Sequence, residues 1–116
     1  MAITVQKIKK EFSQMEMAFV YYSVISSLNN LQLTTRQLQL LSFTAIRGSI
    51  TNPAARKDFC QLYDTSQATI YNIISELRKY NLLVKEQNKI KVHPQLALDF
   101  NNEALVLQMT LIKKSS

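Results

Sequence analysis

One stretch of the sequence gathers side chains that could recognise a partner: DTSQATIYNIISELRKYNLL, residues 64–83. It predicts a tight turn, a helix over about residues 67–80 and a stop at Asn81. The apolar residues of this helix recur at helical spacing and form its buried side: Ile70, Ile73, Ile74, Leu77 and Tyr80. The other side carries Gln, Thr, Tyr, Asn, Ser, Arg and Lys. These side chains can hydrogen-bond to solvent, to another protein or to the edges of base pairs.

No set of residues for catalysis accompanies this stretch. The chain has one cysteine, Cys60, and one histidine, His93, which excludes an internal disulfide and a zinc site made of Cys and His. Gly48 is the single glycine, so the sequence holds no Gly-rich loop for phosphates or dinucleotides. The acidic residues are spread along the chain without metal-ligand spacing. We therefore expect no enzyme activity, no metal and no cofactor.

Length and composition describe one basic, globular domain. The chain has 116 residues, of which 47% are hydrophobic, enough to bury a core. The formal net charge is +6, which favours a polyanionic partner. No apolar run approaches the roughly 20 residues that a membrane span needs. The first residues lack the pattern of a signal peptide, so a cytoplasmic protein without membrane contact is expected.

Start and stop signals place two helices before the stretch described above. Thr34 as N-cap with Gln37 three residues later forms a capping box, and that helix should end at Gly48. Asn52 and Pro53 start the next helix as N-cap and first helical residue. After the third helix, residues 83–86 and 89–92 alternate around a turn-like pair and predict a hairpin. Its inward residues are expected to be Val84, Ile90 and Val92, with the lysines outward.

The two ends of the chain are less clear. Residues 2–8 alternate and predict a short strand, whereas residues 15–28 fit a helix by spacing and a strand by composition. Near the C-terminus, ALVLQMTLIKK predicts another strand, which could pair with the one near the N-terminus. The expected organisation is an N-terminal extension over residues 1–32, a central domain over 33–96 and a C-terminal extension over 97–116.

Three helices followed by a hairpin is the order of a winged helix-turn-helix domain. Residues 66–85 resemble the recognition helix and first wing strand of bacterial MarR, ArsR and GntR regulators, which read S-x-x-T-V-x-x-x-L-x-x-L-x-x-x-G-L-(I/V). Asn81 stands where glycine is usual. The resemblance covers about residues 33–96, and it implies a mainly α fold with a small β part: a winged helix-turn-helix with an extra N-terminal helix and terminal strands.

The same resemblance implies a DNA-binding surface. The third helix would enter the major groove, the second helix would hold the phosphate backbone, and the wing lysines would follow the backbone or minor groove. The implied contact residues are Arg56, Lys57, Ser66, Gln67, Thr69, Tyr71, Asn72, Ser75, Lys85, Lys89 and Lys91. The wing lysines have an equally good second explanation, since lysine protects sheet edges from aggregation.

Two functions fit these observations. The first is a small DNA-binding regulator of transcription that contacts double-stranded DNA as a homodimer or larger assembly. Residues 52–93 hold only three more basic than acidic residues, so several copies would be needed to sum the phosphate contacts. The second is a non-enzymatic structural or assembly protein of a phage virion that uses a winged helix to bind protein, because fold alone does not determine function.

Overall fold

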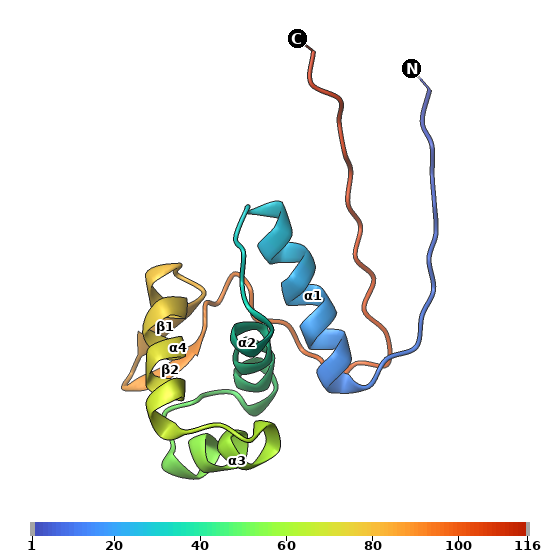
Figure 1. Ribbon diagram of the computed structural model, residues 1–116. Coiled ribbons are helices and arrows are strands. Elements are labelled where there is room, and N and C mark those ends of the chain that lie inside the picture. The colour runs from blue at the N-terminus through green and yellow to red at the C-terminus, as the bar shows by residue number, and fades with distance from the viewer. Residues whose placement is uncertain (1, 116) are drawn as a thin grey trace.

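The structure is a computed structural model that describes residues 2–115, and it is mainly helical (Figure 1). Four helices come first: α1 (Gln14–Leu28), α2 (Thr35–Arg47), α3 (Pro53–Tyr63) and α4 (Gln67–Lys79). An antiparallel hairpin of β1 (Leu83–Glu86) and β2 (Lys89–Val92) follows. A mainly α fold with a small β part and an extra N-terminal helix is therefore confirmed. None of the helices described has the length and hydropathy needed to cross a membrane.

Residues 15–28 lie in helix α1, so the helix predicted from their spacing is correct and the strand predicted from their composition is not. The Ser13 hydroxyl accepts a hydrogen bond from the Glu16 backbone N–H, and the Glu16 carboxylate accepts one from the Ser13 N–H. This second bond lowers the pKa of Glu16, because it favours the ionised carboxylate. At the other end Asn29 caps the helix and Asn30 turns with a φ of 58°. These caps and the packing against α2 outweigh the strand preference of the β-branched and aromatic residues.

The start signals predicted for α2 and α3 are confirmed, and Ser66 supplies the corresponding cap for α4. Thr34 and Gln37 bond each other's backbone N–H groups at the start of α2. Asn52 accepts from the Ala54 N–H at the start of α3, and Ser66 accepts from the Thr69 N–H at the start of α4. Because each cap satisfies a donor that the helix itself cannot, the helix boundaries are set locally.

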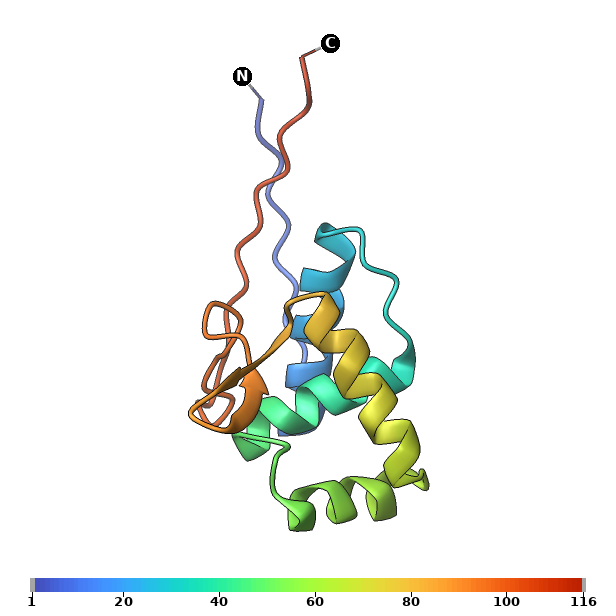
Figure 2. The ribbon, with the colours of Figure 1, turned by 90° about the vertical axis from the view of Figure 1, so that its left-hand side faces the viewer.

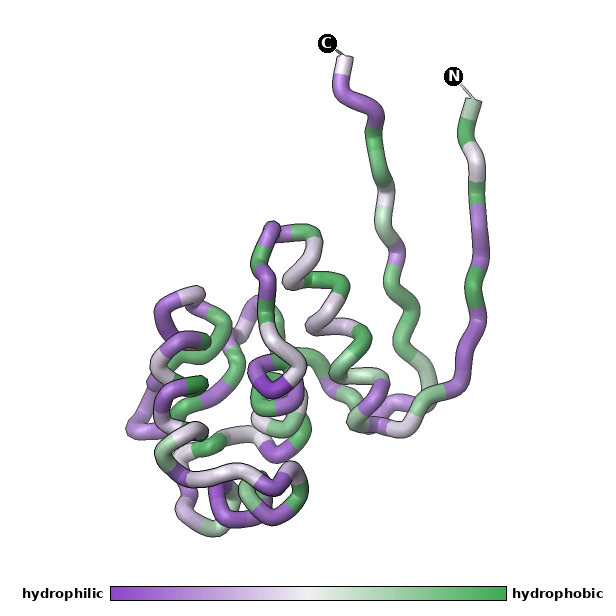
Figure 3. Tube along the Cα trace, viewed as in Figure 1, coloured by the Kyte–Doolittle hydropathy of each residue, from purple (hydrophilic) through white to green (hydrophobic). Residues whose placement is uncertain are grey.

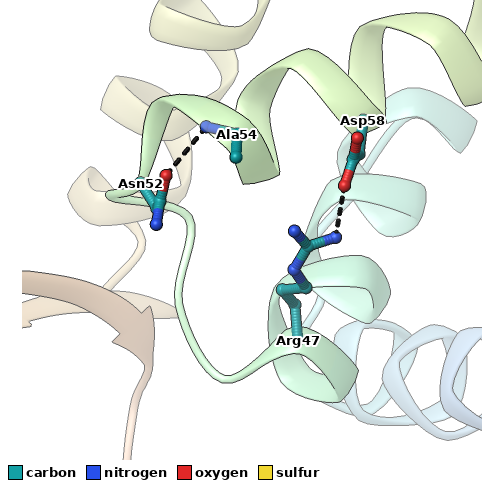
Figure 4. A network of polar contacts seen from close by, with 4 residues as sticks. All are labelled: Arg47, Asn52, Ala54 and Asp58. Carbon is teal, nitrogen blue, oxygen red and sulfur yellow. Dashed lines mark hydrogen bonds and ion pairs between the residues drawn. The ribbon is translucent and has the colours of Figure 1, made fainter.

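The connection between α2 and α3 is fixed from both sides. Gly48 ends α2 with a φ of 98°, a left-handed conformation that suits glycine. Arg47, in the last turn of α2, makes an ion pair of 2.7 Å with Asp58 of α3, next to the Asn52 cap (Figure 4). Both side chains are about half exposed, so this pair guides the connection more than it stabilises the protein.

The hairpin forms as predicted, but its inward residues differ. Gln87 and Asn88 both have positive φ, at 51° and 64°, which is the geometry of a tight two-residue hairpin turn. Leu83 lies opposite Val92, and both are buried, so the prediction that Val84 points inward is wrong. Val84 lies on the other face, opposite Lys91. Directly opposite residues share a face, so the buried Val92 places Leu83 inward and Val84 outward.

The loop between α2 and α3 is hydrogen-bonded to strand β2 of the hairpin. The Ile50 N–H donates to the Ile90 carbonyl oxygen at 2.9 Å, and the Ile90 N–H donates to the Thr51 hydroxyl at 2.6 Å. These bonds occupy the outer edge of β2. Ile50 itself is fully buried, which ties the hairpin to the helical core.

One hydrophobic core joins α1 to the rest of the protein. Tyr22 is buried and donates its hydroxyl to the Leu96 carbonyl oxygen at 2.9 Å, and burial together with the neighbouring Tyr21 raises its pKa. Phe100 packs against both tyrosine rings. The chain after the hairpin thus returns across the helices to α1, where Gln14 bonds the Phe100 carbonyl oxygen.

The predicted terminal strands do not form. Residues 2–12, here called the N-terminal segment, and residues 104–115, the C-terminal segment, are extended but belong to no strand. Both leave the body near the start of α1 and project in the same direction (Figures 1 and 2). Apolar residues recur along both segments and are interrupted by polar ones (Figure 3). Alternation supplies the side chains of a strand, but a strand also needs a neighbour for its backbone, and within residues 2–115 neither segment has one.

Candidate nucleic-acid interface

Helix α4 has two distinct faces. Ile70, Ile73, Ile74 and Leu77 are buried, as the sequence predicted, whereas Tyr80 is 49% exposed and ends the helix outside the core. The polar residues on the opposite face are all exposed: Gln67, Thr69, Tyr71, Asn72 and Ser75. The terminal segments lie away from α4, with α1 and α2 between them (Figure 1). The polar face of α4 is therefore open to solvent within residues 2–115.

Contacts with α2 and α3 hold α4 in place from behind. Its isoleucines and Leu77 belong to the same core as the fully buried Phe59 of α3. The Gln37 side-chain amide of α2 donates to the Glu76 carboxylate at 2.9 Å. That bond fixes the rotation of α4 about its own axis, and it engages the one carboxylate that α4 carries.

The hydroxyl groups at the start of α4 are occupied by the cap. Ser66 Oγ accepts from the Thr69 N–H and lies 2.9 Å from Thr69 Oγ1. Ser66 therefore serves first to start the helix. Gln67, Tyr71, Asn72 and Ser75 have no side-chain hydrogen bond within residues 2–115 and are available to a partner.

Arg56 is turned towards the protein. Its guanidinium Nη1 donates to the Thr51 carbonyl oxygen and, at 3.4 Å, to the Ile50 carbonyl oxygen. The group also lies over the Tyr71 ring, 5.4 Å from the ring centre. Arg56 thus links the α2–α3 loop, α3 and α4, and it sets the position of an aromatic residue on the exposed face.

A shallow hollow of about 490 Å³ opens between α4 and the hairpin. Three cationic residues, Arg56, Arg78 and Lys79, line it together with Tyr71, Ile74, Ser75 and Ile90, and no acidic residue does. Arg78 and Lys79 form no ion pair within residues 2–115. The hollow is therefore positive and open to an anion.

Sequence reasoning did not single out Arg78 and Lys79 as contact residues. They lie in the last turn of α4, where cations also suit the helix dipole. The hollow combines residues 56, 71, 78 and 90, and this grouping exists only once the loop has brought Ile90 of β2 next to α3 and α4. The excess of basic residues in residues 78–91 was the available signal.

The hairpin lysines are not equivalent. Lys85 and Lys89 are exposed. Lys91 is half-buried and lies 3.3 Å from Glu86, which neutralises much of its charge. Lys57 on α3 is exposed, but it does not line the hollow. The structure thus brings Lys85 and Lys89 to the edge beside α4 as cations without an acidic partner in the part described.

No cluster of three or more His, Cys, Asp or Glu residues that could hold a metal occurs within residues 2–115. Cys60 is half-buried on α3, and His93 Nδ1 accepts from the Gln95 N–H at 3.1 Å. The chemistry available on this surface is hydrogen bonding and charge attraction. No family model, curated protein or solved structure matches this chain.

Proposed function

We propose that this protein is a winged helix-turn-helix protein that binds double-stranded DNA and regulates transcription in the cytoplasm, as a homodimer or larger assembly. In this proposal α2, α3 and α4 are the three helices, α4 is the recognition helix, and β1 and β2 form the wing. The loop at Ile50 is bonded to β2 and so holds the wing against the helices.

The observation that carries the proposal is the free polar face of α4. Its apolar residues are buried in the core, and the polar residues of the opposite face are exposed and lie away from the terminal segments. A helix held from behind in this way fits the B-DNA major groove, which is about 12 Å wide. Asn72 and Gln67 would pair with adenine, and Tyr71, Thr69 and Ser75 would contact phosphate or thymine methyl groups.

The charges around α4 fit the phosphate backbone on both sides of such a groove. Arg78 and Lys79 in the hollow and Lys85 and Lys89 on the hairpin have no acidic partner within residues 2–115. Lys57, which lies on α3, would contact the phosphate backbone of the DNA. Lys91 would contribute less because Glu86 holds it, and Arg56 would act mainly by positioning Tyr71.

The test is binding to a set of duplexes at several salt concentrations, after selection of a preferred sequence. We expect log Kd to rise steeply with log salt. Asn72→Ala should weaken binding to the preferred sequence by about 1–3 kcal/mol and reduce the preference, and Lys89→Ala should weaken all duplexes evenly and flatten the slope by about 1. Lys7→Ala, which removes the same charge far from α4, is the matched control. Equal effects of Lys7→Ala and Lys89→Ala, or no duplex binding at low salt, would overturn the proposal.

A second function is supported by a different observation. Nine of the thirteen large apolar side chains exposed in residues 2–115 lie in the two terminal segments. Segments of this kind are used to build assemblies, so the protein could instead be a structural or assembly component of a phage virion, with the winged helix binding protein. Stable rings or shells in native mass measurements, together with weak and sequence-independent DNA binding, would favour this function over the first.

A further inference from the structure

We propose that the C-terminal segments of two copies of this chain pair as antiparallel strands about a twofold axis through Gln108. The proposal specifies how a homodimer would form, and it does not depend on whether the protein binds DNA. Its starting point is that the C-terminal segment is already extended, projects from the body and has no backbone partner within residues 2–115.

The sequence of the segment is self-complementary in this register. With Gln108 opposite Gln108 of the second copy, Leu107 lies opposite Met109, and Leu105 lies opposite Leu111. All four apolar residues are at odd positions, so they fall on one face of the paired strands. A shift of one residue would place them on opposite faces, so the shared apolar face excludes every odd shift of the register.

The charges at the ends of the paired region agree with the same register. Lys113 of each copy comes to lie opposite Glu103 of the other. Opposite charges across an antiparallel pair stabilise it, whereas a parallel arrangement in register would place Lys113 and Lys114 against the same lysines. The charges therefore favour the antiparallel dimer over a parallel one.

The exposed apolar surface is of the size that a dimer requires. Val106 and Ile112 are 86% exposed, Leu111 is 81% exposed, and Ile3, Val5 and Ile8 of the N-terminal segment are more than 70% exposed. Each such side chain removes roughly 60–120 Å² of apolar surface on burial. Val106 and Ile112 lie on the face opposite Leu107, Met109 and Leu111, so the other seven exposed apolar side chains of the two segments offer roughly 400–800 Å² per copy. A stable interface buries about 800 Å² on each partner.

The N-terminal segments complete the arrangement. A ribbon of two strands is marginal alone, and at least one more strand or a packed layer is needed. The N-terminal segment projects from the body in the same direction as the C-terminal segment, so one from each copy can flank the central pair (Figures 1 and 2). Lys7, Lys9 and Lys10 would then protect the outer edges of the sheet from further pairing.

Cross-linking tests the register directly. In a Cys60→Ala background, Gln108→Cys should form an intermolecular disulfide under mild oxidation, because directly opposite Cβ atoms lie within disulfide range. Thr110→Cys is the matched control on the same face, since the two copies of that residue would be about 13 Å apart. Equal cross-linking of the two variants, or cross-linking of Thr110→Cys alone, would refute the register.

Light scattering and sedimentation of the full chain test the interface. We expect a dimer whose Kd rises at least tenfold in Leu107→Lys and several-fold in Lys113→Glu. The double variant Glu103→Lys with Lys113→Glu should recover the wild-type Kd, which a general loss of folding would not allow. A monomer at all concentrations, as expected if the two segments of one chain paired with each other, would overturn the proposal. So would a dimer that Leu107→Lys leaves unchanged.

Discussion

Arg56 offers a sharp test of how the exposed face of α4 is positioned. The variants are Arg56→Lys, which keeps the charge, and Arg56→Met, which keeps most of the length. A hydrogen bond from a charged group contributes about 1.5–3 kcal/mol and an exposed cation–π contact about 0.5–1 kcal/mol. Since Arg56 is half-buried and water can replace part of its bonding, we expect each variant to lose about 1–2 kcal/mol of unfolding free energy. Arg56→Lys should not keep the wild-type stability, because lysine lacks the planar guanidinium group that bonds the Ile50 and Thr51 carbonyl oxygens.

Urea unfolding followed by circular dichroism measures the loss. Lys57→Met is the matched control, because Lys57 is the exposed neighbour and should change stability by less than about 0.5 kcal/mol. In DNA binding, both Arg56 variants should lose affinity equally and leave the salt slope unchanged. If Arg56→Lys were as stable as the wild type and only Arg56→Met reduced the slope, Arg56 would be a phosphate contact, and the positioning role argued above would be refuted.

Two further predictions concern stability. Asn81 has a φ of 61°, so Asn81→Val should cost about 1–2 kcal/mol in urea unfolding while Asn81→Gly changes little; equal effects would show that the left-handed turn before Leu82 is not needed. The lowered pKa of Glu16 means that its cap stabilises the protein above the unfolded-state pKa, near 4.5, and that this stabilisation is lost as the pH falls through the lower folded-state pKa. Wild type should therefore lose more unfolding free energy than Glu16→Gln between about pH 5.5 and pH 3, and parallel curves would contradict this.

The helices were predictable because their determinants are local. Thr34, Asn52 and Ser66 each satisfy a backbone donor two or three residues away, so their effect can be read from a short window of sequence. The inward face of the hairpin was not predictable in the same way. The prediction placed Val84 and Val92 on one face, but the two-residue turn at Gln87 and Asn88 pairs Leu83 with Val92 and Val84 with Lys91.

The site was predictable only in part for a related reason. The exposed face of α4 follows from helical periodicity, which is local. The role of Arg56 and the cationic hollow depend on residues up to 34 positions apart, from Arg56 to Ile90, which are joined by the loop at Ile50 and by β2. For the terminal segments, the sequence predicted strands that the structure does not contain within residues 2–115. Their alternation is clear in the sequence, but whether a strand forms depends on a neighbour outside the segment.

The DNA-binding proposal and the dimer proposal can be tested together through the positive charge around α4. Five cations around it have no acidic partner in the part described and are assigned to phosphate above, namely Lys57, Arg78, Lys79, Lys85 and Lys89. If each neutralised one phosphate, the slope of log binding constant against log salt would be about −4.5 for one copy and about −9 for two. The terminal segments project from the other side of α1 and α2, so a dimer built on them leaves both α4 faces uncovered (Figure 1). Leu107→Lys should therefore shift the slope from about −9 towards about −4.5 without changing the DNA-binding surface, because it separates the two copies.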